Sequence, residues 1–179
     1  MGKPKLGEDR VIFMGSSITE GWSATVPKYW NKHPNYINRG VGGETTPQIF
    51  LRFRANVVQL APKVVVILAK NKDITENIGF TTSQTIANNI FTMADLAQQH
   101  VIKVVICSIL PAYDYPRKKG LQPASKIIEI NTLLKAYAQS NGFHYTNYHS
   151  QMKDHKNGLI KEFTNDGVHL TKAGYLKLE

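Results

Sequence analysis

A carboxylate and a histidine lie three positions apart near the C-terminal end of the chain, in the polar segment Asn-Asp-Gly-Val-His at residues 165–169. A hydroxyl group is available near the other end, at Ser17, which follows an apolar run and a glycine. Serine, histidine and aspartate are the groups of a nucleophilic acyl-transfer site, because the imidazole takes the hydroxyl proton while the carboxylate fixes its tautomer and stabilises the imidazolium. Ser17, Asp166 and His169 are therefore the candidate catalytic residues.

A glycine-rich turn at residues 40–46, Gly-Val-Gly-Gly-Glu-Thr-Thr, could supply the remaining part of such a site. Glycines between a strand and a helix let backbone N–H groups approach an oxyanion, and the helix N-terminus favours negative charge there. Taken alone, Gly42 and Gly43 indicate only a tight turn. Together with Ser17 and His169 they favour an oxyanion-binding loop.

Strand-like and helix-like segments alternate along the chain. The apolar runs predict strands at residues 10–14, 36–39, 64–69, 103–110 and 144–147, and the helical patterns fall at residues 46–60, 82–100, 123–140 and from 171 onward. The continuous run Val-Val-Val-Ile-Leu at residues 64–68 is typical of a strand covered on both faces. We therefore predict an α/β fold, a three-layer doubly wound parallel sheet, with ligand bound at the carboxyl ends of the strands.

The length of 179 residues and the hydrophobic content of 42% predict one α/β domain over residues 1–179, with the last helix interrupted at Glu179. The formal charge of +9 would suit an anionic partner such as nucleic acid. However, the basic residues are scattered, the run at 117–119 is short, and no nucleic-acid motif is present. We expect a solvated basic surface and no nucleic-acid partner.

Nothing in the chain approaches the roughly 18 apolar residues of a membrane span, and residues 1–5 lead into a strand without the apolar region of a signal peptide. The single cysteine, Cys107, lies in an apolar run and is expected in the core. We therefore expect a soluble protein without a membrane partner. Both a cytoplasmic location and a secreted or periplasmic one, with a signal peptide removed, remain open, as does the oligomeric state.

The other notable side chains have simpler explanations. The remaining histidines show no metal-ligand spacing, so we predict no metal and no cofactor; they are His33, His100, His144, His149 and His155. Trp22 is close enough in sequence to Ser17 to line an acyl pocket, although core packing explains it as well. Tyr113, in the proline-bounded segment 111–117 after the fourth strand, either shapes the pocket or belongs to a rigid loop.

Three segments of this chain resemble the sequence blocks of the SGNH, or GDSL-type, serine esterases. Residues 15–19 are similar to the first block, which implies Ser17 as the nucleophile and puts Ser16 where Asp or Asn is common. Residues 38–46 are similar to the second, which implies backbone oxyanion donors at Gly43 and Ser17. Residues 166–169 are similar to the last, which implies His169 as the base. The resemblance is closest to acetylhydrolase-like members with a flavodoxin-like fold, acting on small acyl esters that include carbohydrate acetates.

The third block departs from the family pattern. Where the family has Gly-x-Asn-Asp, whose asparagine is an oxyanion donor, this chain has Lys70, Asn71, Lys72 and Asp73. Lys72 stands at the asparagine position and could donate as an ammonium, while Lys70 and Asn71 are expected beside the pocket. Loss of one oxyanion donor lowers turnover by on the order of 10² to 10³ in other serine hydrolases. Leu170 replaces the usual proline after the histidine, which adds freedom to that loop.

Two function classes follow. The first is an esterase or acetylhydrolase that uses Ser17, His169 and Asp166 through a covalent acyl-enzyme. The second is a catalytically impaired or engineered variant that keeps the pocket and binds ligand without efficient turnover, for which the evidence is Lys70 and Lys72.

Overall fold

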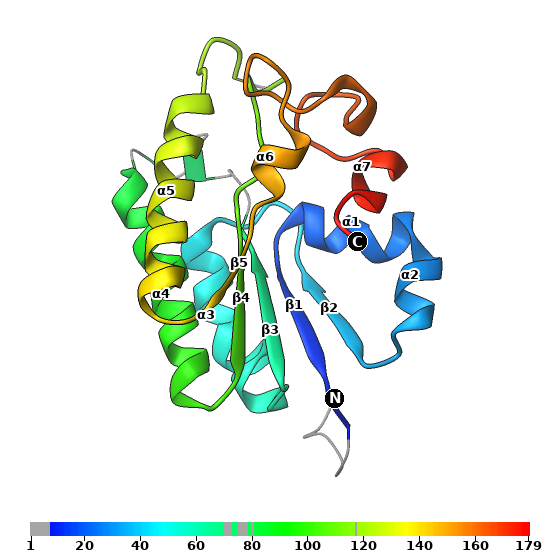
Figure 1. The fold of residues 1–179 in the computed structure, drawn as a ribbon, viewed down its shortest axis with the longest axis vertical. Helices are drawn as coiled ribbons and strands as arrows, with labels where there is room; N and C mark the ends of the chain where they lie inside the picture. Colours follow the sequence, from blue (N-terminus) through cyan, green and yellow to red (C-terminus); the bar gives the residue numbers. More distant parts are fainter. Residues whose placement is uncertain (1–7, 70–72, 75–78, 80, 117) are drawn as a thin grey trace.

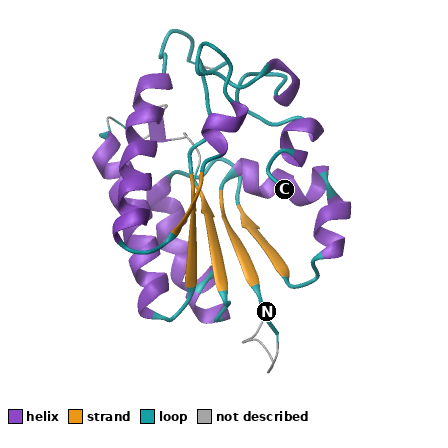
Figure 2. Ribbon diagram, in the orientation of Figure 1, coloured by secondary structure: helices purple, strands orange, loops and turns teal. Residues whose placement is uncertain are grey.

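Five parallel strands form the centre of the molecule. The computed structural model describes residues 8–69, 73–74, 79, 81–116 and 118–179. The strands are β1 (Val11–Gly15), β2 (Tyr36–Gly40), β3 (Val64–Leu68), β4 (Lys103–Cys107) and β5 (His144–Thr146). They pair in the order β2-β1-β3-β4-β5, and all four pairings are parallel. Figure 2 shows the sheet with helices around it, which confirms the predicted α/β class.

Helices cover both faces of this sheet. They are α1 (Ser17–Thr25), α2 (Pro27–Lys32), α3 (Thr46–Asn56), α4 (Ser83–Gln99), α5 (Ala124–Ser140), α6 (Tyr148–Met152) and α7 (Lys172–Leu176), with 3-10 helices at Val58–Leu60 (η1) and Lys161–Phe163 (η3). Figure 1 shows α3, α4 and α5 on one side of the sheet and α1, α2 and α7 on the other. The three predicted layers are therefore confirmed.

Alternation along the strands divides the core in two. Ile12 and Met14 of β1 pack with residues of α3, α4 and α5, whereas Phe13 packs with α1, α2 and α7. Because successive side chains of a strand point to opposite faces, one short apolar run serves both layers. The sheet is thus the shared wall of two apolar clusters.

Three short helices were not expected from the sequence. Helix α1 contains Gly21 and three threonine or serine residues besides Ser17, so its intrinsic propensity is weak, and α2 begins at Pro27 immediately afterwards. Helix α6 has only five residues. Helices this short depend on tertiary packing, which a periodicity pattern does not report.

Two of the predicted segments extend well beyond the observed elements. The strand predicted to reach residue 110 ends at Cys107, because the side chain of Asn131 in α5 bonds the backbone of Ile109: its Oδ1 accepts from the N–H at 2.7 Å and its Nδ2 donates to the carbonyl at 3.0 Å. The helix predicted over 46–60 ends at Asn56, whose side chain bonds the carbonyl of Arg52 at 3.1 Å, and a separate 3-10 turn follows.

The strand order places the candidate site. Gly15 pairs in register with Gly40 of β2 and with Leu68 of β3, so β1, β2 and β3 end at one level. The connections from β1 and from β2 run to opposite sides of β1, which makes the gap between β1 and β3 the topological switch point. Ligands of open α/β sheets bind at this point, outside the carboxyl ends of the strands.

Candidate active site

The proposed nucleophile begins a helix directly after the first strand. Ser17 is half-buried and is the first residue of α1, and Ser16 is the N-cap residue. The N–H groups of a first helical turn have no acceptor within the helix and carry the positive end of its dipole. Ser17 therefore presents its hydroxyl and its backbone N–H at an end of a helix that favours a developing negative charge.

Two glycines allow α1 to sit against the end of the sheet. A Cβ at Gly15 would lie 2.2 Å from Oγ1 of Thr19, and one at Gly40 would lie 2.1 Å from the backbone nitrogen of Glu20. Asn38 of β2 holds the same junction, because its Nδ2 donates to the Thr19 carbonyl at 2.6 Å while its Oδ1 accepts from the N–H of Gly40 at 2.8 Å. The first turn of α1 is thus fixed to the ends of both strands.

Asp166 and His169 are joined directly. Nδ1 of His169 lies 2.7 Å from Oδ2 of Asp166. The other carboxylate oxygen, Oδ1, accepts from the backbone N–H groups of Val168 at 2.9 Å and His169 at 2.7 Å. A neutral imidazole held in this way carries its proton on Nδ1 and leaves Nε2 able to accept one, which is the form a general base requires.

The same hydrogen bonds control the charge of Asp166. Burial alone would raise its pKa, but the hydrogen bonds from the side chain and backbone of His169 and from the backbone of Val168 outweigh burial and hold the pKa at about 2. The carboxylate is consequently ionised at neutral pH. An ionised partner stabilises the imidazolium that forms when His169 accepts a proton.

Thr164 closes the loop that carries both residues. Its backbone forms an isolated antiparallel bridge with Leu170. Its hydroxyl donates to the His169 carbonyl at 2.8 Å and accepts from the N–H of Gly167 at 2.9 Å. Gly167 has a φ of +82°, which favours glycine. Leu170, where the resemblance led us to expect proline, packs against Gly174 at the start of α7.

Packing of α7 on α1 brings this loop to the nucleophile segment. The ring of Tyr175 lies 6.4 Å from that of Trp22 between centroids, and a Cβ at Gly21 would meet the Tyr175 hydroxyl at 2.6 Å. Tyr175 follows His169 by six residues, and Gly21 lies one helical turn after Ser17. The two candidate segments, far apart in sequence, are therefore neighbours in the fold (Figure 1). A hydrogen bond between Ser17 and His169 stays a prediction.

Gly43 has a left-handed backbone conformation, and its role as an oxyanion donor stays a prediction. Its φ is +81°, a region that other residues rarely occupy, and it is exposed. The next turn of the chain is rigid, because Thr45 caps α3 through a capping box in which the Gln48 side chain accepts from the Thr45 N–H at 2.9 Å. At Gly42 a Cβ would lie 2.5 Å from a carboxylate oxygen of Glu20, so Gly42 is needed for close packing instead.

The remaining predicted pocket residues have different surroundings. Trp22 is 1% exposed and packs among Phe13, Tyr29 and Trp30, as the core-packing explanation expects. Ser16 is also 1% exposed. Lys70, Asn71 and Lys72 lie outside the described residues.

Tyr113, in contrast to Ser16 and Trp22, is well exposed, at 48%. Its loop adjoins the loop of Asp166 and His169, because a Cβ at Gly167 would come within 3.9 Å of the carbonyl of Asp114. Lys156 lies over the Tyr113 ring, with Nζ 5.8 Å from the ring centroid. Tyr113 therefore lies on a loop that adjoins the loop of Asp166 and His169.

Two polar groups near the site were missed by sequence reasoning. Arg52 of α3 bonds the ends of β1 and β2 and the glycine loop. Asp73, 2% exposed, accepts from the N–H of Thr46 at 3.0 Å and from its hydroxyl at 2.7 Å. Burial raises the pKa of Asp73 although these bonds act to lower it. Neither pairing has a local signal, since 37 residues separate Arg52 from Gly15 and 27 separate Asp73 from Thr46.

A hollow of about 550 Å³ lies at the opposite end of the strands, where residues such as Val64, Val101 and His144 line it. It is remote from Ser17.

Across the described ranges, no group of three His, Cys, Asp or Glu side chains could hold a metal ion. Within those same ranges, none of the helices has both the length and the apolar character to cross a membrane.

Family comparison assigns the chain to a class. Residues 13–177 match the model of the GDSL-like Lipase/Acylhydrolase family, and the chain belongs to that family. The match extends from β1 through the loop of Asp166 and His169. The resemblance seen in the sequence is therefore confirmed at the level of the family.

Two solved structures and one curated protein are similar to this chain. A candidate acylhydrolase from Bacteroides fragilis is 41% identical with a TM-score of 0.94, covering 98% of this chain and 85% of that one. A GDSL-like lipase from Bacteroides thetaiotaomicron is 37% identical with a TM-score of 0.93, covering 99% of this chain and 88% of that one. The uncharacterized lipoprotein YqeF of Bacillus subtilis is 28% identical over 121 residues, 59% of this chain and about half of the lipoprotein's length (50%).

Proposed function

We propose that this member of the acylhydrolase family is a serine esterase that hydrolyses small acyl esters, chiefly acetyl esters. The observation that carries the proposal is the 2.7 Å pairing of Asp166 with Nδ1 of His169, on a loop that α7 holds against α1. This pairing leaves Nε2 as the proton acceptor, and Ser17 begins α1. These observations support a site that combines a nucleophile, a base and an ionised orienting group.

The reaction has two steps. Oγ of Ser17 attacks the ester carbonyl while Nε2 of His169 takes the hydroxyl proton, and the tetrahedral oxyanion accepts hydrogen bonds from the backbone N–H groups of Ser17 and Gly43. The C–O bond to the alcohol then breaks, and the alcohol leaves with the proton from His169. Water, deprotonated by the same nitrogen, next attacks the acyl-serine and releases the carboxylic acid and the free Ser17 hydroxyl.

An acetylated carbohydrate is the proposed natural substrate. Tyr113 supports this proposal, because its exposed ring, on the loop beside that of Asp166 and His169, offers the face opposite Lys156 to the alcohol portion of the ester. The family resemblance to acetylhydrolases points in the same direction.

The experiment combines turnover with covalent labelling. Hydrolysis of a chromogenic acetyl ester should be measurable for the parent chain and lost in Ser17→Ala, and a fluorophosphonate probe should label the parent at Ser17. Ser16→Ala should keep the label, because the neighbouring hydroxyl is buried. Labelling at Ser16, or no labelling of folded parent protein, would contradict the assignment of the nucleophile.

The second candidate function is ligand binding without efficient turnover. The specific observation that favours it is the pair of lysines at positions 70 and 72, where the family has a glycine and an oxyanion-donating asparagine. A neutral amide is better preorganised than a mobile ammonium and places no positive charge near His169. In this case Lys72→Asn, alone or with Lys70→Gly, should raise turnover of the acetyl ester; unchanged turnover in both variants would argue against impairment by the lysines.

A further inference from the structure

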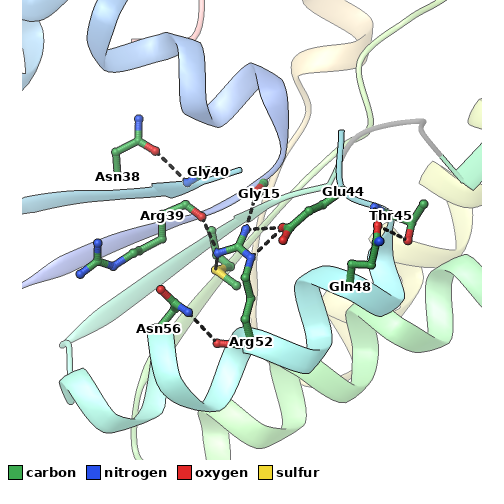
Figure 3. A network of polar contacts seen from close by, with 10 residues as sticks. Gly15, Asn38, Arg39, Gly40, Glu44, Thr45, Gln48, Arg52 and Asn56 are labelled. Carbon is green, nitrogen blue, oxygen red and sulfur yellow. Dashed lines mark hydrogen bonds and ion pairs between the residues drawn. The ribbon is translucent and has the colours of Figure 1, made fainter. Parts of the chain in front are cut away.

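Arg52 is the centre of a polar network at the carboxyl ends of the first two strands (Figure 3). Nε lies 2.6 Å from Oε2 of Glu44, Nη1 donates to the carbonyl of Arg39 at 2.9 Å, and Nη2 donates to the carbonyl of Gly15 at 2.9 Å. Both side chains of the ion pair are only 17% exposed. One guanidinium group therefore binds three separate segments of backbone or side chain.

Two of these three acceptors lie close in sequence to a proposed donor of the oxyanion hole. Gly15 precedes Ser17 by two residues, and Glu44 follows Gly43 directly. The carbonyl of Gly15 also accepts from the N–H of Val41 at 3.2 Å, at the start of the glycine loop. Arg52 thus connects the segment of one proposed N–H donor to the segment of the other without reaching either donor itself.

The bonds of Arg52 to Glu44, Arg39 and Gly15, which we call the clamp, limit the movement of the glycine loop. The segment from Gly40 to Gly43 contains three glycines, which have a large conformational freedom. Two donors stabilise an oxyanion only when both lie about 2.7–3.1 Å from its position. The planar guanidinium donates in fixed directions, whereas a lysine ammonium is a flexible point charge.

We propose that Arg52 is a positioning residue that fixes the spacing between the backbone N–H groups of Ser17 and Gly43. This inference rests on the proposed esterase function, because the spacing matters only if the two groups share one oxyanion. Its contribution is made through the backbone, since its bonds to Glu44, Arg39 and Gly15 end short of the proposed reacting groups. Glu44 belongs to the clamp as the acceptor that keeps the guanidinium in place.

The main test compares Arg52→Lys with Arg54→Lys, the same chemical change at an exposed arginine of the same helix. For acetyl ester hydrolysis, Arg52→Lys should lower kcat by about 10- to 100-fold, because small displacements of catalytic groups have effects of this size. KM should change by less than about threefold, since the oxyanion bonds form mainly in the transition state. Arg54→Lys should match the parent.

Residue-resolved amide hydrogen exchange provides a readout that does not depend on activity. In Arg52→Lys the N–H of Val41 should exchange at least about tenfold faster, because its acceptor at Gly15 loses the guanidinium. The N–H of Ser108, which bonds the Thr146 carbonyl at 2.9 Å far from the clamp, should be unchanged and so report intact global stability. Equal acceleration at both amides would overturn a local clamp.

A charge reversal separates the clamp from a simple ion pair. Arg52→Glu combined with Glu44→Arg restores opposite charges, but a glutamate at position 52 cannot donate to the carbonyls of Gly15 and Arg39. We expect kcat to stay low in this double variant, and recovery to the parent value would overturn the inference. If folded parent protein shows neither hydrolysis nor Ser17 labelling, the proposed function fails. Faster hydrogen exchange in Arg52→Lys at the Val41 N–H, without a change at the Ser108 N–H, would still show that Arg52 holds the glycine loop in place.

Discussion

Asp166 is the residue with the most demanding set of bonds in the candidate site. One carboxylate oxygen accepts two backbone N–H groups and the other meets His169. In Asp166→Asn, the amide can present only one oxygen, so either the loop or the imidazole loses its partner. If Asp166 orients His169 as proposed, kcat for an acetyl ester should fall by about 10² to 10⁴, with KM little changed, as for orienting carboxylates in known triads.

The same residue predicts a pH dependence of stability. The folded-state pKa of about 2 lies below the ordinary value of 3.8, so the contribution of Asp166 is fully present above pH 4 and is lost as pH falls through 2. The side chain is 39% exposed, so the contribution should stay below about 1 kcal/mol. Urea unfolding at pH 5 and pH 2.5 should show the parent and Asp166→Asn converging at the lower pH; a constant difference would contradict the prediction.

Thr19 offers a test of an unsatisfied hydroxyl. Its side chain is fully buried, and Oγ1 has no hydrogen-bond partner among the described residues. Thr19→Val removes that group at nearly constant shape, so we expect unfolding free energy to stay level or rise by about 1 kcal/mol. Thr46→Val is the matched control, because the Thr46 hydroxyl bonds Asp73 and Asn89, and it should lose about 1–3 kcal/mol. Chemical denaturation measures both, and a destabilised Thr19→Val would refute the prediction.

At the scale of the elements, the apolar patterns located the strands, the long helices and the short α7, and missed the short helices α1, α2 and α6. All five strands and helices α3, α4 and α5 lie where apolar patterns put them. Helices α1, α2 and α6 were absent from the prediction because five to nine residues carry too little periodic signal. The end of β4 depends on Asn131, a partner 22 residues from Ile109, so no local pattern could locate it.

The candidate site also contains residues that the sequence could indicate and a residue that it could not. Ser17, Gly43, Asp166 and His169 could be proposed from the sequence because each stands in a short block with a recognisable neighbour pattern. The bonds of Arg52 could not, because its acceptors are brought to it by the parallel pairing of β1 with β2 and the return of α3. Positioning groups are set by topology, and a local motif contains no information about them.

Asp73 shows how one element anchors another. Its carboxylate caps the first residue of α3, where the N–H of Thr46 is fully buried. Asp73→Ala would leave that N–H without an acceptor, and we expect the unfolding free energy to fall by about 1–3 kcal/mol. Asp73→Asn keeps one oxygen acceptor and should lose less. Equal losses in thermal or urea unfolding would show that the charge, not the hydrogen bond, is what stabilises this junction.

At the scale of the whole molecule, the sheet couples two apolar clusters. The larger contains residues of α3, α4 and α5, and the smaller contains aromatic residues of α1, α2 and α7. Strands β1, β3 and β4 contribute alternate side chains to both, so neither cluster can lose its strands without exposing the other. The loop of Asp166 and His169 contacts both clusters, because Val168 of the loop belongs to the larger one and Tyr175 of α7 to the smaller, which links the site to the stability of both faces.

This coupling predicts a single unfolding transition. Both tryptophans, Trp22 and Trp30, lie in the smaller cluster, so their fluorescence reports that face, whereas far-UV circular dichroism reports the helices on both. Ile106→Ala in the larger cluster should lower the unfolding free energy by about 2–5 kcal/mol, and Phe13→Ala in the smaller by about 3–5 kcal/mol. In each variant the fluorescence and dichroism midpoints in urea should coincide, because a two-state unit has one transition for all probes. A fluorescence transition in Phe13→Ala that precedes the loss of helix would show that the aromatic face opens by itself, and esterase activity should then disappear with the fluorescence change.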